Sequence, residues 1–145
     1  MTQSTHIVSA LVALQLCPSS DPWAALACVA GTLLPDIDHP RRCGLVPLGM
    51  RVLGIRHRGM THSLLALAIF ALAGQLAGLV LCAAHLGSYL GLGYGLHLAL
   101  DALNPSKVPL LWPNRRRWGI GLIRTGSLAE MLLLCGLVIL YIALR

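Results

Sequence analysis

Residues 34–40 read L-P-D-I-D-H-P and residues 57–63 read H-R-G-M-T-H-S, and the 34–63 stretch that contains both motifs organises the rest of the chain. It holds two aspartates and three histidines in a chain that has only five acidic residues. Carboxylate and imidazole together suit zinc, manganese, iron or nickel better than calcium or magnesium. We therefore expect this stretch to contribute to a metal site.

The composition favours a membrane protein. The 145 residues are 57% hydrophobic and 11% charged, with a mean hydropathy of +0.76. Ordinary soluble domains contain about 25% charged residues. The length is that of one domain, so we expect a single domain over residues 1–145. The five cysteines form no C-x-x-C pair, and we interpret them as small hydrophobic residues rather than as a disulfide framework.

Five apolar runs predict an all-α polytopic membrane bundle of about four to five helices. The first two runs, residues 5–16 and 23–34, are short. At about 1.5 Å per residue, each would cover about 18 Å of a hydrocarbon core that is about 30 Å thick. They are either short spans with frayed ends or a hairpin that enters the bilayer partway. Longer runs follow at residues 64–84, 86–103 and 127–144.

Several residues predict local features of these helices. Asp21 is a plausible N-cap, and Pro22 suits the first position of the second helix. That helix is expected to end at Pro35. Thr61 is expected to cap the third helix after a turn at Gly59. The fourth run contains glycines that would let helices approach closely, namely Gly87, Gly91, Gly93 and Gly95.

The basic residues predict how the bundle is oriented. Ten of the eleven Lys and Arg residues lie in two connections, 41–58 and 107–124, which are separated by two helical passes. Both connections therefore face one side, and the positive-inside rule identifies it as the cytoplasm. The turn at residues 17–22 and His85 then face the opposite side, where His85 is interpreted as structural.

The same topology brings the candidate ligands to the cytoplasmic interface. His97 and Asp101, at i and i+4, share one face of a membrane helix, where ionisable groups are costly unless they are paired or bound. The candidate metal ligands are His6, Asp36, Asp38, His62, His97 and Asp101. His57 and Glu130 are candidate catalytic acid or base groups, or further ligands. Two metals about 3.5–4 Å apart would use such a set naturally.

Each candidate has a structural alternative. Asp36 and Asp38 could end a helix in a solvated turn, and His97 could simply hydrogen bond to Asp101. Glu130 lies near the start of a helix, where the helix dipole favours an acid in any case. These alternatives make a structural test of the site necessary.

The motifs of several other function classes are missing from the sequence. It has no recognisable Ser-His-Asp triad, G-x-S-x-G elbow, P-loop or dinucleotide fingerprint. One Phe and three Tyr offer no base-stacking platform, so we expect no nucleic-acid partner. The arginines near the motifs could neutralise a substrate phosphate, although membrane orientation alone would explain them; they are Arg56, Arg58, Arg115, Arg116 and Arg117.

Four blocks resemble the YdjM-like family of inner-membrane metal-dependent hydrolases. They are G-T-L-L-P-D-I-D-H-P (31–40), H-R-G-M-T-H-S (57–63), H-L-A-L-D-A-L-N-P-S-K-V-P-L-L-W-P (97–113) and T-G-S-L-A-E (125–130). The resemblance implies a small helical protein of the bacterial inner membrane with a metal-dependent hydrolase activity. By position it supports a site made of Asp36, Asp38, His57, His62, His97, Asp101 and Glu130. It implies no particular substrate.

We therefore expect a multi-pass hydrolase that uses one or two divalent metal ions, with zinc first and manganese or iron as alternatives. Metal-activated water would attack a phosphoester or ester of a lipid or other membrane-surface substrate from the cytoplasmic side. The alternative is a non-catalytic metal-binding membrane protein, either a metal carrier or a structural partner in a complex. A carrier would place ionisable residues along several spans at midplane depth, whereas clustering at one surface favours the enzyme.

Overall fold

The computed structural model describes residues 1–39, 58–114 and 116–145, with the side chain of Asp38 outside the description, and every regular element in these ranges is helical. The α-helices are α1 (Gln3–Leu16), α2 (Pro22–Leu33), α4 (Leu64–Leu81), α5 (Leu86–Ala102) and α6 (Leu128–Ala143). Two short 3-10 helices are also present: η1 (Leu34–Asp38) follows α2 directly, and η2 (Met60–His62) comes just before α4. The all-α prediction is confirmed for the described residues, and the five predicted runs correspond to these five α-helices.

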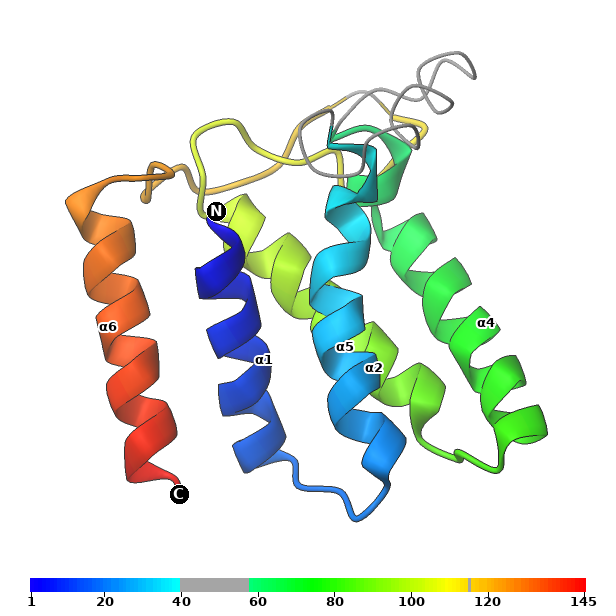
Figure 1. The fold of residues 1–145 in the computed structure, drawn as a ribbon. Helices are drawn as coiled ribbons and strands as arrows, with labels where there is room; N and C mark the ends of the chain where they lie inside the picture. The colour runs from blue at the N-terminus through cyan, green and yellow to red at the C-terminus, as the bar shows by residue number, and fades with distance from the viewer. Residues whose placement is uncertain (40–57, 115) are drawn as a thin grey trace.

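The helices form a bundle in which α2 and α5 are the central pair (Figure 1). Helix α4 packs on α5, and α1 packs between α2 and α6. The start of α1, η1, η2, the end of α5 and the start of α6 all lie at one end of the bundle, at the top of Figure 1. The turns between α1 and α2 and between α4 and α5 lie at the other end. Side chains from distant parts of the sequence can therefore meet at one end.

Glycines allow the close approach of α5 to its neighbours. A Cβ atom added at Gly93 would lie 1.9 Å from the carbonyl oxygen of Cys28 on α2, and one added at Gly87 would lie 2.4 Å from the carbonyl oxygen of Ala71 on α4. Any larger residue would therefore collide with backbone. The expectation of close packing is confirmed at these two positions.

The predicted helix boundaries are correct at both ends of α2 and wrong at the start of α4. Asp21 caps α2 by accepting a hydrogen bond of 2.9 Å from the Trp23 amide. The α-helix ends at Leu33, beside Pro35 as predicted, and the 3-10 helix η1 continues to Asp38 because proline is tolerated in the first turn of a helical segment. Ser63, not Thr61, caps α4, because Thr61 lies within η2.

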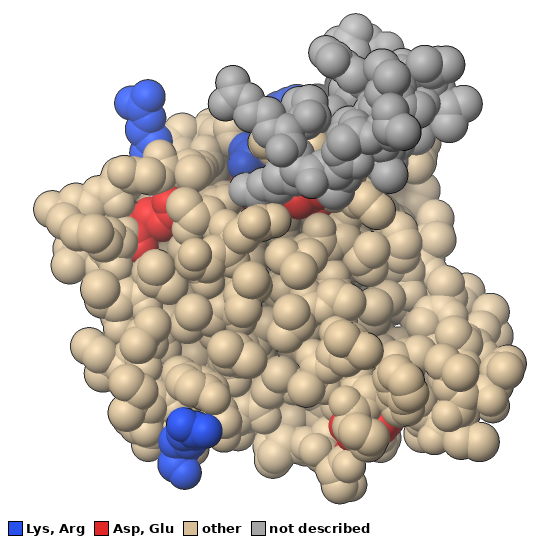
Figure 2. Space-filling model, viewed as in Figure 1, with Lys and Arg blue, Asp and Glu red and all other residues tan. Residues whose placement is uncertain are grey.

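The outside of the bundle is strongly apolar. Helix α4 has a mean hydropathy of 2.4 over 18 residues and only 11% of this window is buried, unlike the core helix of a soluble protein. It is the one helix among the described residues that is long and apolar enough by itself to cross a membrane, whereas α2 and α6 are shorter apolar helices. On the face drawn in Figure 2, charged side chains lie toward the two ends, with an uncharged band between them.

Candidate metal centre

Five of the predicted ligands meet at one end of the bundle. His6 comes from α1, Asp36 from η1, His62 from η2, and His97 and Asp101 from the last turns of α5. The three imidazoles and the carboxyl of Asp101 are at most 1% exposed, and Asp36 is 9% exposed. Burying this many ionisable groups without charge compensation would be unfavourable. The arrangement therefore differs from a solvated turn at a helix end.

The backbone of α2 selects one tautomer of neutral His97. Its Nδ1 atom lies 2.7 Å from the carbonyl oxygen of Thr32. Because a carbonyl oxygen only accepts, Nδ1 donates this hydrogen bond, and in the neutral ring Nε2 then carries a lone pair. Nε2 is buried and has no hydrogen-bond partner within the described part of the chain. The alternative in which His97 exists to hydrogen bond Asp101 is not supported, because the Nε2–Oδ2 distance is 3.9 Å.

The lone pair of His97 points at negative charge. Nε2 lies 3.9 Å from Oδ1 of Asp36 and 3.9 Å from Oδ2 of Asp101. These three electron-rich atoms repel one another, and the guanidinium group of Arg58, 2.8 Å from Oδ2 of Asp101, offsets part of that repulsion. A metal ion between them would convert this repulsion into coordination.

His62, from η2, approaches the same two carboxylates as His97. Its Nε2 atom lies 3.7 Å from Oδ1 of Asp36 and 3.7 Å from Oδ2 of Asp101. Its Nδ1 atom lies 3.1 Å from the Thr61 hydroxyl. The Tyr94 hydroxyl donates to the carbonyl oxygen of Thr61, which holds η2 against α5. We call Asp36, His62, His97 and Asp101 the ligand quartet.

The four histidine–carboxylate separations within the ligand quartet are 3.7 Å to 3.9 Å. A tetrahedral zinc ion with bonds of about 2.0–2.2 Å holds neighbouring ligand atoms about 3.3–3.6 Å apart. These four separations are therefore within a few tenths of an ångström of ligand spacing. Asp36, His62 and His97 form one group with ligand atoms within 4.8 Å of one another, and His6, His97 and Asp101 form another. Two carboxylates would also neutralise a divalent charge.

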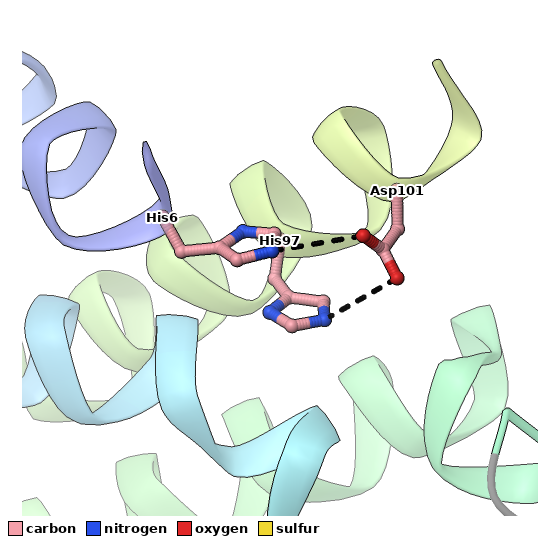
Figure 3. Close-up of side chains that lie close together, drawn as sticks. All are labelled: His6, His97 and Asp101. Atoms are coloured by element: carbon pink, nitrogen blue, oxygen red, sulfur yellow. Dashed lines mark ion pairs between the residues drawn. The ribbon is translucent and has the colours of Figure 1, made fainter. Parts of the chain in front are cut away.

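The second oxygen of Asp101 faces a different histidine (Figure 3). Oδ1 lies 3.6 Å from Nε2 of His6, whose ring stacks on that of His97 with centroids 3.9 Å apart and planes 9° apart. Neither ring nitrogen of His6 has a hydrogen-bond partner among the described residues, and both are buried. Asp101 also forms two ion pairs. Its Oδ2 atom lies 2.8 Å from Nη2 of Arg58, and its Oδ1 atom lies 2.5 Å from the amino group of Met1.

Glu130 lies in a different environment. One carboxylate oxygen accepts hydrogen bonds from the Thr2 amide at 2.6 Å and the Thr5 hydroxyl at 3.3 Å, and the other accepts one from the Gly126 amide at 2.6 Å. It thus joins the start of α6 to the start of α1. The structure does not bring it into the metal-binding groups of the described residues, and its catalytic role stays a prediction.

The remaining candidates divide into two sets. Arg116 stacks over the ring of Trp118 at 4.8 Å, and Arg117 donates to the carbonyl oxygen of Ser106 at 3.3 Å, so neither is directed at the ligand quartet. Of the arginines proposed to neutralise a phosphate, Arg58 is the one that the described residues place there. The other candidates lie outside the described residues; they are Arg56, His57, Arg115 and the side chain of Asp38.

The sequence did not reveal the residues that orient the ligands. Thr32 acts through its backbone carbonyl group, and because every residue has such a group, the sequence does not single it out. Tyr94 is fully buried and was read as part of an apolar run. Its hydroxyl at the end of such a run was the one available signal, because a buried tyrosine usually finds a hydrogen-bond acceptor.

Comparison with known proteins agrees with these motifs. The chain is 40% identical over 114 residues to inner membrane protein YdjM of Escherichia coli strain K12, an alignment that covers 70% of this chain and 53% of the relative. It matches YdjM of Shigella flexneri equally well, and the chain spans about half the length of these two curated relatives.

A more distant relative covers nearly the whole chain. The uncharacterized protein YvsG of Bacillus subtilis strain 168 is 32% identical over 149 residues, which covers 94% of this chain and 89% of the relative. No solved structure gives a significant match. The model of the YdjM inner membrane protein family matches residues 1–145, and the chain belongs to that family.

Proposed function

We propose that this protein is a multi-pass inner-membrane hydrolase that uses a divalent metal ion bound by the ligand quartet. The observation that carries the proposal is the Nε2 atom of His97, which is buried and lies 3.9 Å from the carboxylates of both Asp36 and Asp101. A divalent cation among these three groups would bind the imidazole and both carboxylates at once.

An inner-membrane location is supported by the family and by the printed names of two relatives. The apolar outer surfaces of α4 and α6 support it as well, since large side chains such as Leu72 and Ile139 are more than 60% exposed. Helices of 16 to 18 residues, such as α6, α5 and α4, extend about 24–27 Å at about 1.5 Å per residue, close to the thickness of the hydrocarbon core.

The orientation follows from the charges near the site. The described basic residues of the two connections flank the end of the bundle that holds the ligand quartet; they are Arg58, Lys107, Arg116, Arg117 and Arg124. By the positive-inside rule this end faces the cytoplasm. The substrate would therefore be reached from the cytoplasmic leaflet.

The donor set favours zinc, with manganese or iron as alternatives. Two imidazoles and two carboxylates match the ligands that borderline metals prefer. When bound, such an ion supplies a Lewis acid that activates water for attack on an ester at neutral pH. The protein shields these side chains from solvent and fixes their orientation. The Thr32 carbonyl sets the tautomer of His97, and the backbone contacts of η2 position His62.

Arg58 supports an anionic ester as the substrate. Its guanidinium group contacts Asp101 and the Ser106 hydroxyl, and its side chain is 18% exposed at the rim of the site. An arginine at this position can neutralise a phosphate oxygen while the metal ion polarises the same group. A phosphoester is therefore the substrate class that fits these charges.

A cavity of about 470 Å³ beside the site supports an amphiphilic substrate. It lies between the first turns of α1 and α6, and hydroxyl groups of Thr2, Ser4 and Ser127 line it together with Leu128 and Leu134. Thr5 borders this cavity, while the next residue, His6, faces Asp101. The mixed lining suits a molecule with a polar head and an apolar chain.

Metal analysis tests the site first. Protein purified in detergent without chelators should contain zinc, manganese or iron by elemental analysis. Asp36→Asn and His97→Ala should reduce that content at least about 10-fold, because each removes a ligand from a set of four. His85→Ala is the matched control, since His85 lies at the opposite end of α5 and should leave the content unchanged. Wild-type protein without metal would refute the site.

Hydrolysis is tested separately. Metal-loaded protein is incubated with phosphatidic acid and with a polyprenyl phosphate in mixed micelles, and released phosphate is measured. Release that depends on His97 supports the proposed function. Full metal content with no hydrolysis of either lipid would instead favour the non-catalytic metal-binding protein, a carrier or a structural partner.

A further inference from the structure

We propose that the centre holds a second divalent ion between His6 and Asp101, with the Asp101 carboxylate bridging the two metals. This inference rests on the metal site of the proposed function and deepens it. Its starting point is His6, a buried imidazole that the ligand quartet does not use.

His6 has the environment of a ligand without its ion. Its side chain is 1% exposed, and both ring nitrogens lack a hydrogen-bond partner in the described part of the protein. A buried polar group without a partner destabilises the folded state. Nε2 points toward Oδ1 of Asp101 at 3.6 Å, too far for a hydrogen bond and suitable for an intervening ion (Figure 3). An ion at this place would give Nε2 of His6 the partner that it lacks.

The two stacked rings aim at different oxygens of one carboxylate. Nε2 of His97 approaches Oδ2 of Asp101, whereas Nε2 of His6 approaches Oδ1. The rings are nearly parallel, with centroids 3.9 Å apart, so ions on their Nε2 atoms would lie a similar distance apart. Two-metal hydrolytic sites have metals about 3.5–4 Å apart. The stacking distance thus matches the separation that a bridging carboxylate produces.

The charges around Asp101 point to the same two positions. The amino group of Met1 approaches Oδ1 at 2.5 Å, and the guanidinium group of Arg58 approaches Oδ2 at 2.8 Å. Each carboxylate oxygen of Asp101 therefore already contacts one positively charged group. A metal on each side would replace these contacts and leave Arg58 available to the substrate.

The proposed second position is more open than the first. His6 and Asp101 provide two protein ligands, so water or a substrate oxygen would complete the coordination. Manganese and magnesium commonly bind through few protein ligands and several waters. An ion held in this way can exchange water for substrate, which is what a hydrolytic site requires.

Manganese titration tests the second position without any assay of activity. Full-length protein in detergent is stripped with a chelator and loaded with Mn²⁺, and bound metal is counted by elemental analysis. Wild-type protein should bind about two equivalents and give the exchange-coupled paramagnetic resonance spectrum of a Mn²⁺ pair. His6→Ala should bind about one equivalent and give the six-line spectrum of an isolated ion. His6→Gln, which keeps the bulk of the side chain, should behave in the same way.

The outcomes distinguish this inference from the proposed function. One equivalent in wild type that His6→Ala retains would overturn the second position and leave the ligand quartet intact. No bound Mn²⁺ in any form would overturn the second position, whereas the ligand quartet is refuted by wild-type protein that holds no zinc, manganese or iron. Two equivalents with isolated six-line spectra would place the second ion elsewhere and refute the bridge. His85→Ala serves as the control and should match wild type, because His85 is at the other end of the bundle.

Discussion

At the scale of single residues, the site depends on groups that orient the ligands as much as on the ligands themselves. In the proposed metal site, the carbonyl oxygen of Thr32 accepts a hydrogen bond from Nδ1 of His97 and so leaves Nε2 as the nitrogen that would bind the ion. Tyr94 helps to position His62, because its hydroxyl group donates a hydrogen bond to the carbonyl oxygen of the neighbouring Thr61. Such supporting contacts usually change metal affinity by about 10–100-fold when they are removed.

Tyr94→Phe should weaken the site without removing a ligand. The variant keeps the ring contact with Phe70 at 5.5 Å but loses the hydrogen bond that holds η2. We expect a loss of about 1–3 kcal/mol in the free energy of unfolding. Thermal melting in detergent measures stability, and a competitive chelator titration measures metal affinity, which should fall about 10-fold.

Tyr89→Phe is the matched control for this change. Tyr89 donates to the carbonyl oxygen of Cys17 in an exposed contact away from the site. It should alter the melting temperature less and leave metal affinity unchanged. Equal metal affinity in Tyr94→Phe and wild type would contradict the role given to Tyr94.

At the scale of helices, the pairing of α2 with α5 decides whether the site forms. His97 on α5 bonds to the backbone of α2, and this requires the two helices to be close. Gly93, one turn before His97, makes that approach possible. The sequence element that assembles the site is thus a glycine that contacts no ligand.

Gly93→Ala should separate α2 from α5. The new Cβ would lie 1.9 Å from the Cys28 carbonyl oxygen, so backbone must move. Overpacking of this kind costs about 1–3 kcal/mol or more, and metal content should fall because the Thr32–His97 hydrogen bond is strained. Gly136→Ala is the control, since nothing lies within 4 Å of a Cβ there. It should be neutral or stabilise α6 by about 0.5–1 kcal/mol. Equal melting temperatures for the two variants would contradict the packing argument.

At the scale of the whole molecule, the candidate ligands gather at one end of an apolar bundle. The ligand quartet, Arg58 and the contact of Glu130 with α1 all lie at this end. Asp21 and His85 lie at the other end, in the turns before α2 and α5. This asymmetry predicts a fixed orientation in the membrane.

Cysteine labelling in intact spheroplasts measures that orientation. In a background without native cysteines, Ser20→Cys, in the turn before α2, should react with a membrane-impermeant maleimide added from outside. Lys107→Cys, in the connection after α5, should react only after the membrane is opened, because basic connections stay in the cytoplasm. The reverse pattern would contradict a site that faces the cytoplasm. Labelling of both positions in opened cells is the control for reactivity.

Much of this architecture was predictable because its signals are local. Runs of apolar residues predicted the five α-helices, and Asp21 with Pro22 predicted the start of α2. Charge distribution predicted that His6, Asp36, His62, His97 and Asp101 would reach the same end, and the structure brings these five together. The helix assignments depend only on residues that are neighbours in the sequence. The common end of the ligands depends only on the number of helices between one basic connection and the next.

The rest depended on contacts between segments far apart in the chain. Thr61 looked like the cap of α4, but the η2 turn moves that role to Ser63. The hydrogen bonds of Glu130 could not be predicted either, because its oxygens accept them from the backbone amides of Thr2, before α1, and Gly126, before α6. The division of the two Asp101 oxygens between His6 and His97 likewise follows from how α1 and α5 pack. Backbone amides and carbonyl groups are the same in every sequence, so only the tertiary structure shows which of them meet a given side chain.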